Sequence, residues 1–302
     1  MPEILPIKID PNLCAGCGLC IDVCPFRNLS LINGKATLEG EHCISCGHCA
    51  AVCPEDAIEA PAIEGGMADY NTFSIDRKWL PHGQYDTAGL VSLMSSRRSC
   101  RNFLDKPVDS ALLEDLVKIG ATAPSGTNSQ LWTFTILPTR KAVLAFGGHV
   151  ASYFMKLNAL AEKYLLRTAL KFAGKGELDE YYHKYYPIVK KAMDEWAESG
   201  RDRLFHGASS VIAVGMQPGA SCPAEDALLA TQNILLASHS MGLGSCLIGF
   251  AVSAIKQEPE IKRSLGMPAD ETVYAVIALG YPNESYRTIA GRKMAVIRYF
   301  EG

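Results

Sequence analysis

The sequence predicts an α+β protein with two parts, a small cysteine-rich unit at the N-terminus and a larger domain after it. Eight of the 11 cysteines in this chain of 302 residues lie between Cys14 and Cys53. After that segment, helical stretches and short apolar strands alternate without the strict rhythm of a parallel sheet. We therefore expect the larger domain to hold an antiparallel-rich sheet flanked by helices.

Composition and charge exclude several classes of protein. The chain is 48% hydrophobic and 20% charged, and its 29 basic and 32 acidic residues give a formal net charge of -3. This balance gives no sign of a nucleic-acid partner. The first residues, MPEILPIKID, lack the basic and apolar regions of a signal peptide, and polar residues interrupt the most apolar long stretch, 227–250. We expect a cytoplasmic protein with no membrane partner.

Residues 1–60 are expected to form the N-terminal unit. Apolar alternation predicts strands over 4–9 and 57–63. Between them, the stretch 29–38 is typical of a hairpin, because its central Asn33-Gly34 pair suits a type I′ turn.

A linker is predicted over residues 61–87, which contain prolines and a Gly-Gly pair and show no periodicity. The larger domain is then 88–302. Asp109 is a plausible N-cap for a helix that must end before Pro124. A long helical region is expected over 150–200 and another helix from Pro223, with strands over 132–137, 209–216, 272–280 and 294–300.

The two cysteine blocks share the spacing C-x2-C-x2-C-x3-C-P, at Cys14–Pro25 and Cys43–Pro54. Thiolates three residues apart converge from one tight loop, which Gly16, Gly18 and Gly47 allow to fold closely. In the doubled motif the fourth cysteine of each block ligates the other cluster. The spacing therefore predicts two [4Fe–4S] clusters, one on Cys14, Cys17, Cys20 and Cys53 and the other on Cys43, Cys46, Cys49 and Cys24.

Two zinc sites are the alternative, because zinc ribbons also use C-x2-C pairs. A ribbon needs neither a third cysteine at +3 nor a Cys-Pro at +4, so two complete copies favour the clusters. Residues 1–60 resemble the bacterial two-cluster ferredoxins throughout, with no ligand missing.

Four segments of the larger domain contain residues suited to a cofactor that carries a phosphate. RRSCR (97–101) combines guanidinium groups with a hydroxyl, both of which suit phosphate oxygens. APSGTNSQLW (123–132) and GLGSCLIGF (242–250) allow a close approach of the backbone, and GYPNESYRTIAGRK (280–293) ends in a basic pair. Each segment alone is equally compatible with ordinary surface or loop.

In this order and spacing, the four segments resemble the nitroreductase-like family of FMN flavoproteins over roughly residues 88–302. The shared features are RRSxR-x-F, Pro-Val at 107–108, APSGxNxQxW, GLGSCxIG, GYP and a late arginine. Leu131 departs from the pattern, since the family usually has proline there. Together with the N-terminal unit, the chain resembles the ferredoxin-fused nitroreductases of anaerobes.

The resemblance implies a homodimer with strand exchange, in which residues 294–300 pack on the partner and two FMN sites span the interface. The ribityl phosphate would be held by Arg97, Arg98, Ser99 and Arg101, joined by Arg292 and Lys293. Residues from the partner subunit would lie near the isoalloxazine ring, namely Pro124, Ser125, Gly126 and Asn128. The ring would be lined, with backbone N–H groups offered towards N5, by Leu247, Ile248 and Gly249.

The remaining candidates have simpler interpretations. Cys100 and Cys246 are expected to be small buried residues, and His206 and His239 to be structural. A cluster at Tyr181, Tyr182, Tyr185 and Tyr186 could cover the flavin or only pack. It lies in the insertion 150–205, which could act as a lid.

The resemblance implies an FMN-dependent oxidoreductase in which electrons pass from the two clusters to FMN and then to a small organic acceptor. A nitroaromatic, a quinone or an activated alkene would be such an acceptor, and an external ferredoxin or another low-potential donor would supply the electrons. No catalytic side chain is expected, because the flavin carries the chemistry. Reductive dehalogenation on the same scaffold and a non-catalytic electron carrier or redox sensor are alternatives.

Overall fold

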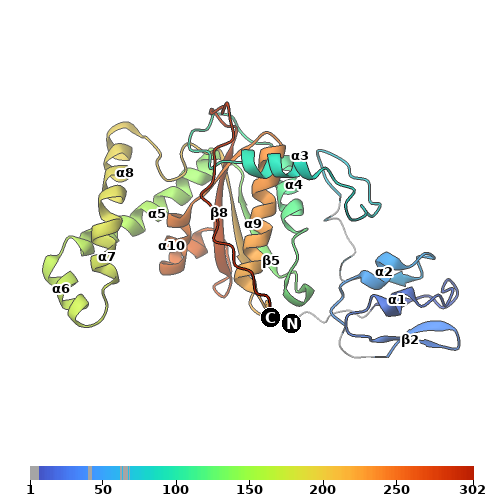
Figure 1. Cartoon of the computed structure of the whole chain (residues 1–302). Coiled ribbons are helices and arrows are strands. Elements are labelled where there is room, and N and C mark those ends of the chain that lie inside the picture. The colour runs from blue at the N-terminus through green and yellow to red at the C-terminus, as the bar shows by residue number, and fades with distance from the viewer. Residues whose placement is uncertain (1–6, 40–42, 62, 64–66, 68) are drawn as a thin grey trace.

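The computed structural model describes residues 7–39, 43–61, 63, 67 and 69–302. Figure 1 shows a small N-terminal unit beside a larger domain in which helices cover both faces of a sheet. The α+β class predicted from the sequence is confirmed. Among the described residues, no helix is both long and apolar enough to cross a membrane.

The N-terminal unit consists of two short antiparallel pairs and two short helices. β1 (Lys8–Ile9) pairs with β4 (Ile58–Glu59), and β2 (Leu29–Ile32) forms a hairpin with β3 (Lys35–Leu38). Positive φ angles of 50° at Asn33 and 74° at Gly34 are those of the predicted type I′ turn. Residues 4–6 and 62 of the predicted strands lie outside the described residues. The helices are α1 (Leu19–Asp22) and α2 (His48–Val52).

The sheet of the larger domain is antiparallel throughout, in the order β5-β6-β8-β7. β6 is buried along its whole length, as its unbroken apolar run predicts. The strands are β5 (Trp132–Leu137), β6 (Ser210–Met216), β7 (Gly244–Leu247) and β8 (Thr272–Gly280). The predicted strands over 132–137, 209–216 and 272–280 are therefore confirmed.

Each face of the sheet supports its own core. On one face, α4 (Ser110–Gly120) and α9 (Pro223–Ser240) pack on alternate residues of β6 and β8 such as Ile212 and Ile277. On the other face, α5 (Arg140–Ala161) and α10 (Gly249–Gln257) pack on the intervening residues such as Val211 and Val276. α11 (Pro259–Ser264) follows α10. The alternation is that of strands buried on both faces.

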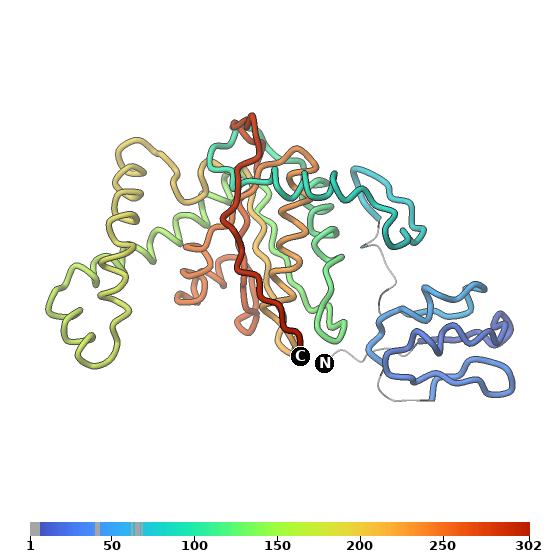
Figure 2. Tube along the Cα trace, in the orientation of Figure 1, coloured from blue at the N-terminus to red at the C-terminus, as the bar shows by residue number. Residues whose placement is uncertain are grey.

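The sequence-based expectation of a strand over 294–300 requires correction, whereas the helical region predicted over 150–200 is confirmed. That region is divided into the end of α5, α6 (Tyr164–Phe172), α7 (Glu177–Lys184) and α8 (Tyr186–Ser199). These helices project from the domain in Figure 1. Residues 294–300 form no strand, and their apolar side chains are exposed, 98% at Met294 and 95% at Phe300. Figure 2 shows this C-terminal segment running extended along the domain. It pairs with no strand of its own chain, and pairing needs a neighbour that supplies the missing hydrogen bonds.

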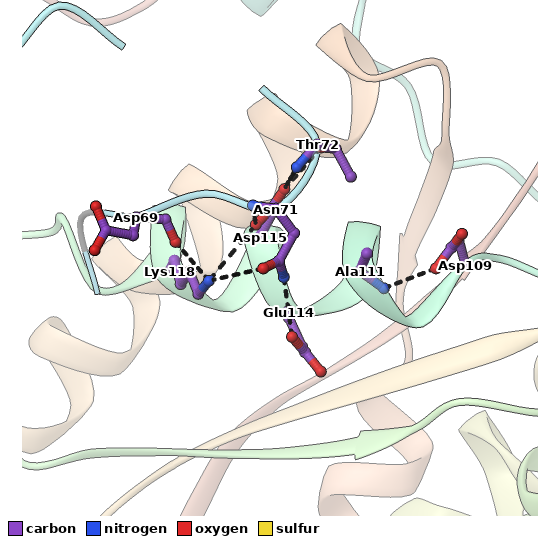
Figure 3. A network of polar contacts seen from close by, with 8 residues as sticks. All are labelled: Asp69, Asn71, Thr72, Asp109, Ala111, Glu114, Asp115 and Lys118. Atoms are coloured by element: carbon purple, nitrogen blue, oxygen red, sulfur yellow. Dashed lines mark hydrogen bonds and ion pairs between the residues drawn. The ribbon is translucent and has the colours of Figure 1, made fainter. Parts of the chain in front are cut away.

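The linker is fastened to α4 by a buried carboxylate (Figure 3). Asp115 is fully buried and accepts hydrogen bonds from the backbone of Asn71 at 2.7 Å and from the backbone and hydroxyl of Thr72 at 2.8 and 2.7 Å. Lys118, with its Nζ 3.9 Å from Asp115, also donates to Asp69 O at 2.6 Å. After this anchor the chain continues to α3 (Thr87–Ser96).

The pKa of Asp115 reflects two opposing effects. Burial raises it, but the hydrogen bonds from Asn71 and Thr72 and the charge of Lys118 together outweigh burial, so the pKa is lowered. A lowered pKa in the folded state adds stability that is present above the pKa of the unfolded chain, about 3.9. That stability is lost as the pH falls through the lower pKa of the folded state.

We expect Asp115→Asn to lower the free energy of unfolding by about 2–4 kcal/mol at neutral pH, because it removes a charged acceptor of three hydrogen bonds. Urea unfolding at pH 7 and at pH 3 measures this, and the difference between variant and wild type should shrink at the lower pH. The matched control is Glu114→Gln, a neighbour on α4 that accepts only from the exposed Asn71 side chain. An equal loss in both variants would contradict the role of Asp115.

Candidate cofactor sites

Two cavities in the N-terminal unit are each lined by four cysteines. One, of about 340 Å³ including open solvent, gathers Cys14, Cys17, Cys20 and Cys53. The other, of about 390 Å³, gathers Cys43, Cys46, Cys49 and Cys24. The fourth cysteine of each block thus lies at the other block's cavity, which is the grouping that the sequence predicts. Four cysteine thiols gathered at one cavity are the ligand set that a [4Fe–4S] cluster requires.

Backbone N–H groups point at one thiol after another. Ala36 N lies 3.4 Å from Cys14 Sγ, and Ser45 N lies 3.4 Å from Cys43 Sγ. Cys24 and Cys53 are the cysteines that line the other block's cavity. Each accepts a hydrogen bond at Sγ from the backbone N–H four residues later, at 3.4 and 3.3 Å. The Ala36 N–H lowers the pKa of Cys14, which favours the thiolate that binds iron. Such hydrogen bonds also tune the potential of a bound cluster.

Glycine is required in the first loop. Gly16 has φ +70°, and a Cβ there would collide with the carbonyl oxygen of Gly34 in the hairpin turn. The backbone of the first cysteine loop therefore lies directly against the β2–β3 turn. Because of this contact, the β2–β3 turn and the first cysteine loop pack directly on each other.

The basic segment of the larger domain lies beside β7. Ser99 forms a bridge with Ser245, and Cys100 N donates to Ser245 O at 2.9 Å. The segments 97–101 and 242–250 are thus brought together, as expected for one site. In the part of the chain that the structure describes, no ion pair occupies the guanidinium groups of Arg97, Arg98 and Arg101, although arginines elsewhere are paired with carboxylates. Three uncompensated cations beside a serine fit a phosphate-bearing group.

Glu284 is a residue of this region that the sequence did not indicate. Its carboxylate accepts from Arg101 N at 3.4 Å and from the hydroxyl of Tyr286 at 2.7 Å. That hydrogen bond raises the pKa of Tyr286, so the phenol stays protonated. The contacts position residues 280–286 beside the basic segment. A motif search could not find the contact between Glu284 and Arg101, because these two residues are 183 positions apart in the sequence.

The loop 124–128 lies at the other end of α4 and is fixed from α9. Gly126 N donates to Asp226 Oδ1 at 2.9 Å, and the indole of Trp132 donates to Asp226 O at 3.1 Å. Ser125 Oγ accepts from Gln130 N at 3.0 Å. Asp226 is buried, and no motif in the sequence indicated its role. The neighbours of this loop differ from those of the basic segment, and nothing in one chain brings Pro124 or Asn128 beside Arg97–Arg101.

The segment 247–249 requires a partial correction. Ile248 is only 5% exposed and packs in the core, and its backbone N–H is already bonded to Val276 O at 2.8 Å. It therefore offers neither a side chain nor an N–H to a ring. Leu247 and Gly249 are exposed. Gly249 opens α10, where an N–H has no acceptor within the helix.

Arg292 and Lys293 are exposed, and no hydrogen bond or ion pair of the described residues joins them to the basic segment. Arg292 Nη1 bonds only to the carbonyls of Ala290 and Gly291, at 3.1 and 3.2 Å. Their part in phosphate binding stays a prediction.

The four tyrosines of the insertion separate into two pairs. Tyr181 and Tyr185 form an aromatic wall with Phe154 and Phe250, whose ring centroids lie 5.5 to 6.4 Å apart. Phe250 directly follows Gly249, so this wall borders the exposed end of β7. Tyr182 and Tyr186 stack on each other instead, at 5.0 Å, with Tyr182 over Arg167. Among the described residues, ring contacts join only the first pair to Phe154 and Phe250.

The other candidates behave as structural residues. Cys100 and Cys246 are buried, and burial raises the pKa of both thiols, which makes them unreactive. His239 is exposed, and burial lowers the pKa of His206.

The crossed grouping of cysteines leads to a test with pairs of substitutions. Cys17→Ser with Cys53→Ser alters one cavity only, so we expect about four irons per chain to remain of about eight in the wild type. Cys46→Ser with Cys53→Ser alters both cavities and should abolish most iron binding. Iron and sulfide analysis after anaerobic purification measures this. The opposite ranking of the two double variants would show that each block holds its own cluster.

Comparison with known proteins identifies both units. Residues 94–281 match the Nitroreductase family model, and residues 6–68 match that of the 4Fe-4S dicluster domain. The chain is 30% identical to an NADH dehydrogenase from Thermus thermophilus, over 62% of this chain and 84% of that protein. It is 23% identical to an iodotyrosine deiodinase from Thermotoga neapolitana, over 70% of this chain and 97% of that protein.

A nitroreductase with bound FMN from Desulfitobacterium hafniense shares the fold, with a TM-score of 0.50 at 21% identity over 69% of this chain and 97% of that one. The dicluster match decides against the zinc alternative. The resemblance inferred from the sequence is therefore confirmed, and this chain belongs to the nitroreductase family of oxidoreductases, with a 4Fe-4S dicluster domain at its N-terminus.

Proposed function

We propose that the protein is an FMN-dependent oxidoreductase that takes low-potential electrons through two [4Fe–4S] clusters and delivers them to a small organic acceptor. The observation that carries the proposal is that one chain holds two cavities lined by four cysteines each and a nitroreductase domain with unpaired cationic side chains. Clusters of this type only transfer electrons, so the acceptor belongs to the second unit. The units are proposed to span 1–60 and 88–302, joined by 61–87.

The residues of the basic segment fit FMN. Arg97, Arg98 and Arg101 would hold the phosphate through charge-assisted hydrogen bonds, with the hydroxyl of Ser99 beside them. Leu247 and the N–H of Gly249 would border the ring. When bound, FMN supplies the exchange of electrons with an organic substrate, which no side chain can perform.

A second copy of the chain would complete this site. The loop 124–128 and the pair Arg292 and Lys293 lie apart from the basic segment within one chain, and the resemblance places the loop at the partner's flavin. The exposed apolar side chains of residues 294–300 support a partner surface for the C-terminal segment. We therefore propose a homodimer.

The aromatic wall favours a planar acceptor. Tyr185 and Phe250 remain 46% and 37% exposed, beside Leu247 and Gly249. Burial raises the pKa of Tyr181 to about 12, and its hydroxyl donates to Asn158 Oδ1 at 2.7 Å, so it is held as a fixed neutral wall. A nitroaromatic would accept two electrons and two protons from solvent, giving a nitroso compound and water. Quinones and activated alkenes are also planar molecules that accept electrons.

Reductive dehalogenation is a second candidate, because one relative is an iodotyrosine deiodinase. In that reaction an aryl halide takes up two electrons and one proton and releases halide. A further relative is an NADH dehydrogenase, which makes NADH the alternative to a ferredoxin-type donor.

Anaerobic purification followed by metal, sulfide and flavin analysis tests the function. In an anaerobic dithionite titration, electrons that enter the clusters should pass on to the flavin, so the oxidised flavin spectrum should be lost before the clusters stay bleached. A screen of nitroaromatics, quinones and iodophenols with reduced ferredoxin as the donor identifies the acceptor. Clusters that stay reduced beside an oxidised flavin, with every acceptor present, would contradict the proposal and favour an electron carrier.

We expect Arg101→Met to weaken FMN binding by about 10- to 100-fold, because it removes a charge-assisted hydrogen bond to the phosphate. Riboflavin lacks the phosphate, so its affinity should not change. Fluorescence titration of the deflavinated protein measures both. Arg263→Met, which removes an arginine paired with Glu260 on α11, is the matched control. An equal loss of riboflavin affinity would place Arg101 away from the phosphate.

We expect Tyr185→Leu to lower kcat/KM for a nitroaromatic by about 3- to 10-fold, because an aromatic contact contributes about 0.5–1.5 kcal/mol. Turnover of ferricyanide, which does not stack, should be unaffected. The control is Tyr186→Leu, which changes the pair that faces away. An equal loss of activity in Tyr185→Leu and Tyr186→Leu would show that the aromatic wall takes no part in binding the nitroaromatic.

A further inference from the structure

We infer that Asn128 clamps the second cysteine loop to the nitroreductase domain, so that the cavity of Cys24, Cys43, Cys46 and Cys49 adjoins the flavin domain and the other cavity faces the external donor. The role of this contact in electron transfer rests on the proposed function. Its structural content, a docking contact between the two units, stands on the geometry alone.

The contact joins two functional loops. Asn128 Nδ2 donates to Ser45 O at 2.9 Å and lies 3.4 Å from Ile44 O. Ile44 and Ser45 lie between Cys43 and Cys46, and both of these cysteines line the second cavity. Asn128 belongs to the loop that the sequence predicted to lie at the flavin ring. One side chain therefore bridges the cavity loop and the predicted flavin loop.

The internal repeat shows that only one cavity is docked. Position by position, the second loop is more buried than the first: Ala15 is exposed while Ile44 is half-buried, and Cys17 is exposed while Cys46 is half-buried. Gly16 is half-buried, and its equivalent Ser45 is buried. The spacing and ligand types of the two loops are the same, so the difference reflects what each loop contacts.

Each loop has a different neighbour at this repeated position. Gly16 packs on the hairpin turn at Gly34, whereas Ser45 O faces Asn128. Ser45 also adopts φ +49° without being glycine. On the opposite side, Thr127 and Asn128 have φ of +51° and +55°. Gly16 is left-handed as well, with φ +70°, so this conformation is a property of the repeated loop, and what differs between the two loops is the neighbour that each contacts.

The first cavity is open to an electron donor. Cys17 is exposed, and so are the apolar side chains of Leu13 and Leu19 around it. Lys35 Nζ donates to Cys14 O at 2.6 Å, which places a cation at this face. Two equivalents of a low-potential one-electron reductant, each oxidised once, would supply the two electrons that leave by the second cavity. Two protons from solvent complete each two-electron reduction.

The test uses the full-length holoprotein and Asn128→Asp, which removes the amide donor and keeps the size. Hydrogen exchange followed by mass spectrometry should show residues 43–47 and 124–130 exchanging about fivefold faster, equivalent to about 1 kcal/mol for one hydrogen bond. Residues 14–18, the repeat equivalent, should not change. Asn233→Asp is the matched control, because its amide bonds to Thr122 within the domain. Asn128→Ser serves if the first variant does not fold.

A second measurement addresses the electron path. Stopped-flow reduction with dithionite-reduced methyl viologen should load the clusters at the wild-type rate in Asn128→Asp, while flavin reduction slows about fivefold, normalised to bound FMN. Unchanged exchange at 43–47, or faster exchange at 14–18, would overturn the inference. A wild-type flavin that is never reduced would refute the proposed function and leave the docking contact intact, so the two failures are distinguishable.

Discussion

The arrangement of the two units depends on the buried carboxylate of Asp115. A tether of irregular chain can position a redox unit only if it is itself fixed, and Asp115 fixes it through the backbone of Asn71 and Thr72. The same helix, α4, ends five residues before the loop of Ser125 and Asn128. One helix therefore carries both attachments of the N-terminal unit. Its packing on α9 makes that helix rigid, and α9 also supplies Asp226 to hold Gly126.

The two anionic cofactors would be accommodated by different physical means. At the cysteine cavities, the compensation comes from backbone N–H groups aimed at thiols, which costs no side-chain entropy and is set by the turn geometry. At the basic segment it comes from arginines whose charges are not neutralised by the protein itself. The first arrangement suits a cluster built into the fold. The second suits a dissociable group, because full charge compensation becomes available only when the ligand binds.

The features that could be predicted from the sequence are those determined by residues close together in the chain. The cysteine spacing predicted the grouping at both cavities, Asp109 predicted the start of α4, which it caps by accepting from Ala111 N, and the apolar run predicted β6. Asp115 and Asp226 could not be found in this way, since each is one aspartate in a helix whose partners lie 43 to 100 positions away. The strand expected over 294–300 failed for another reason, because a strand forms only by pairing with a neighbour, and the apolar pattern of the segment does not report which neighbour it has.

Asn128 shows why two interpretations of one residue can be compatible. The resemblance places it at a flavin ring, whereas the fold places it on the second cysteine loop. Its amide has two polar atoms, and only Nδ2 is engaged, with Ser45 O. Among the described residues, the carbonyl oxygen of this amide has no hydrogen-bond partner, so it is available to a second group. Replacing it with a purely apolar side chain would remove the hydrogen bond to Ser45 O and, with it, the amide that the resemblance places at the flavin.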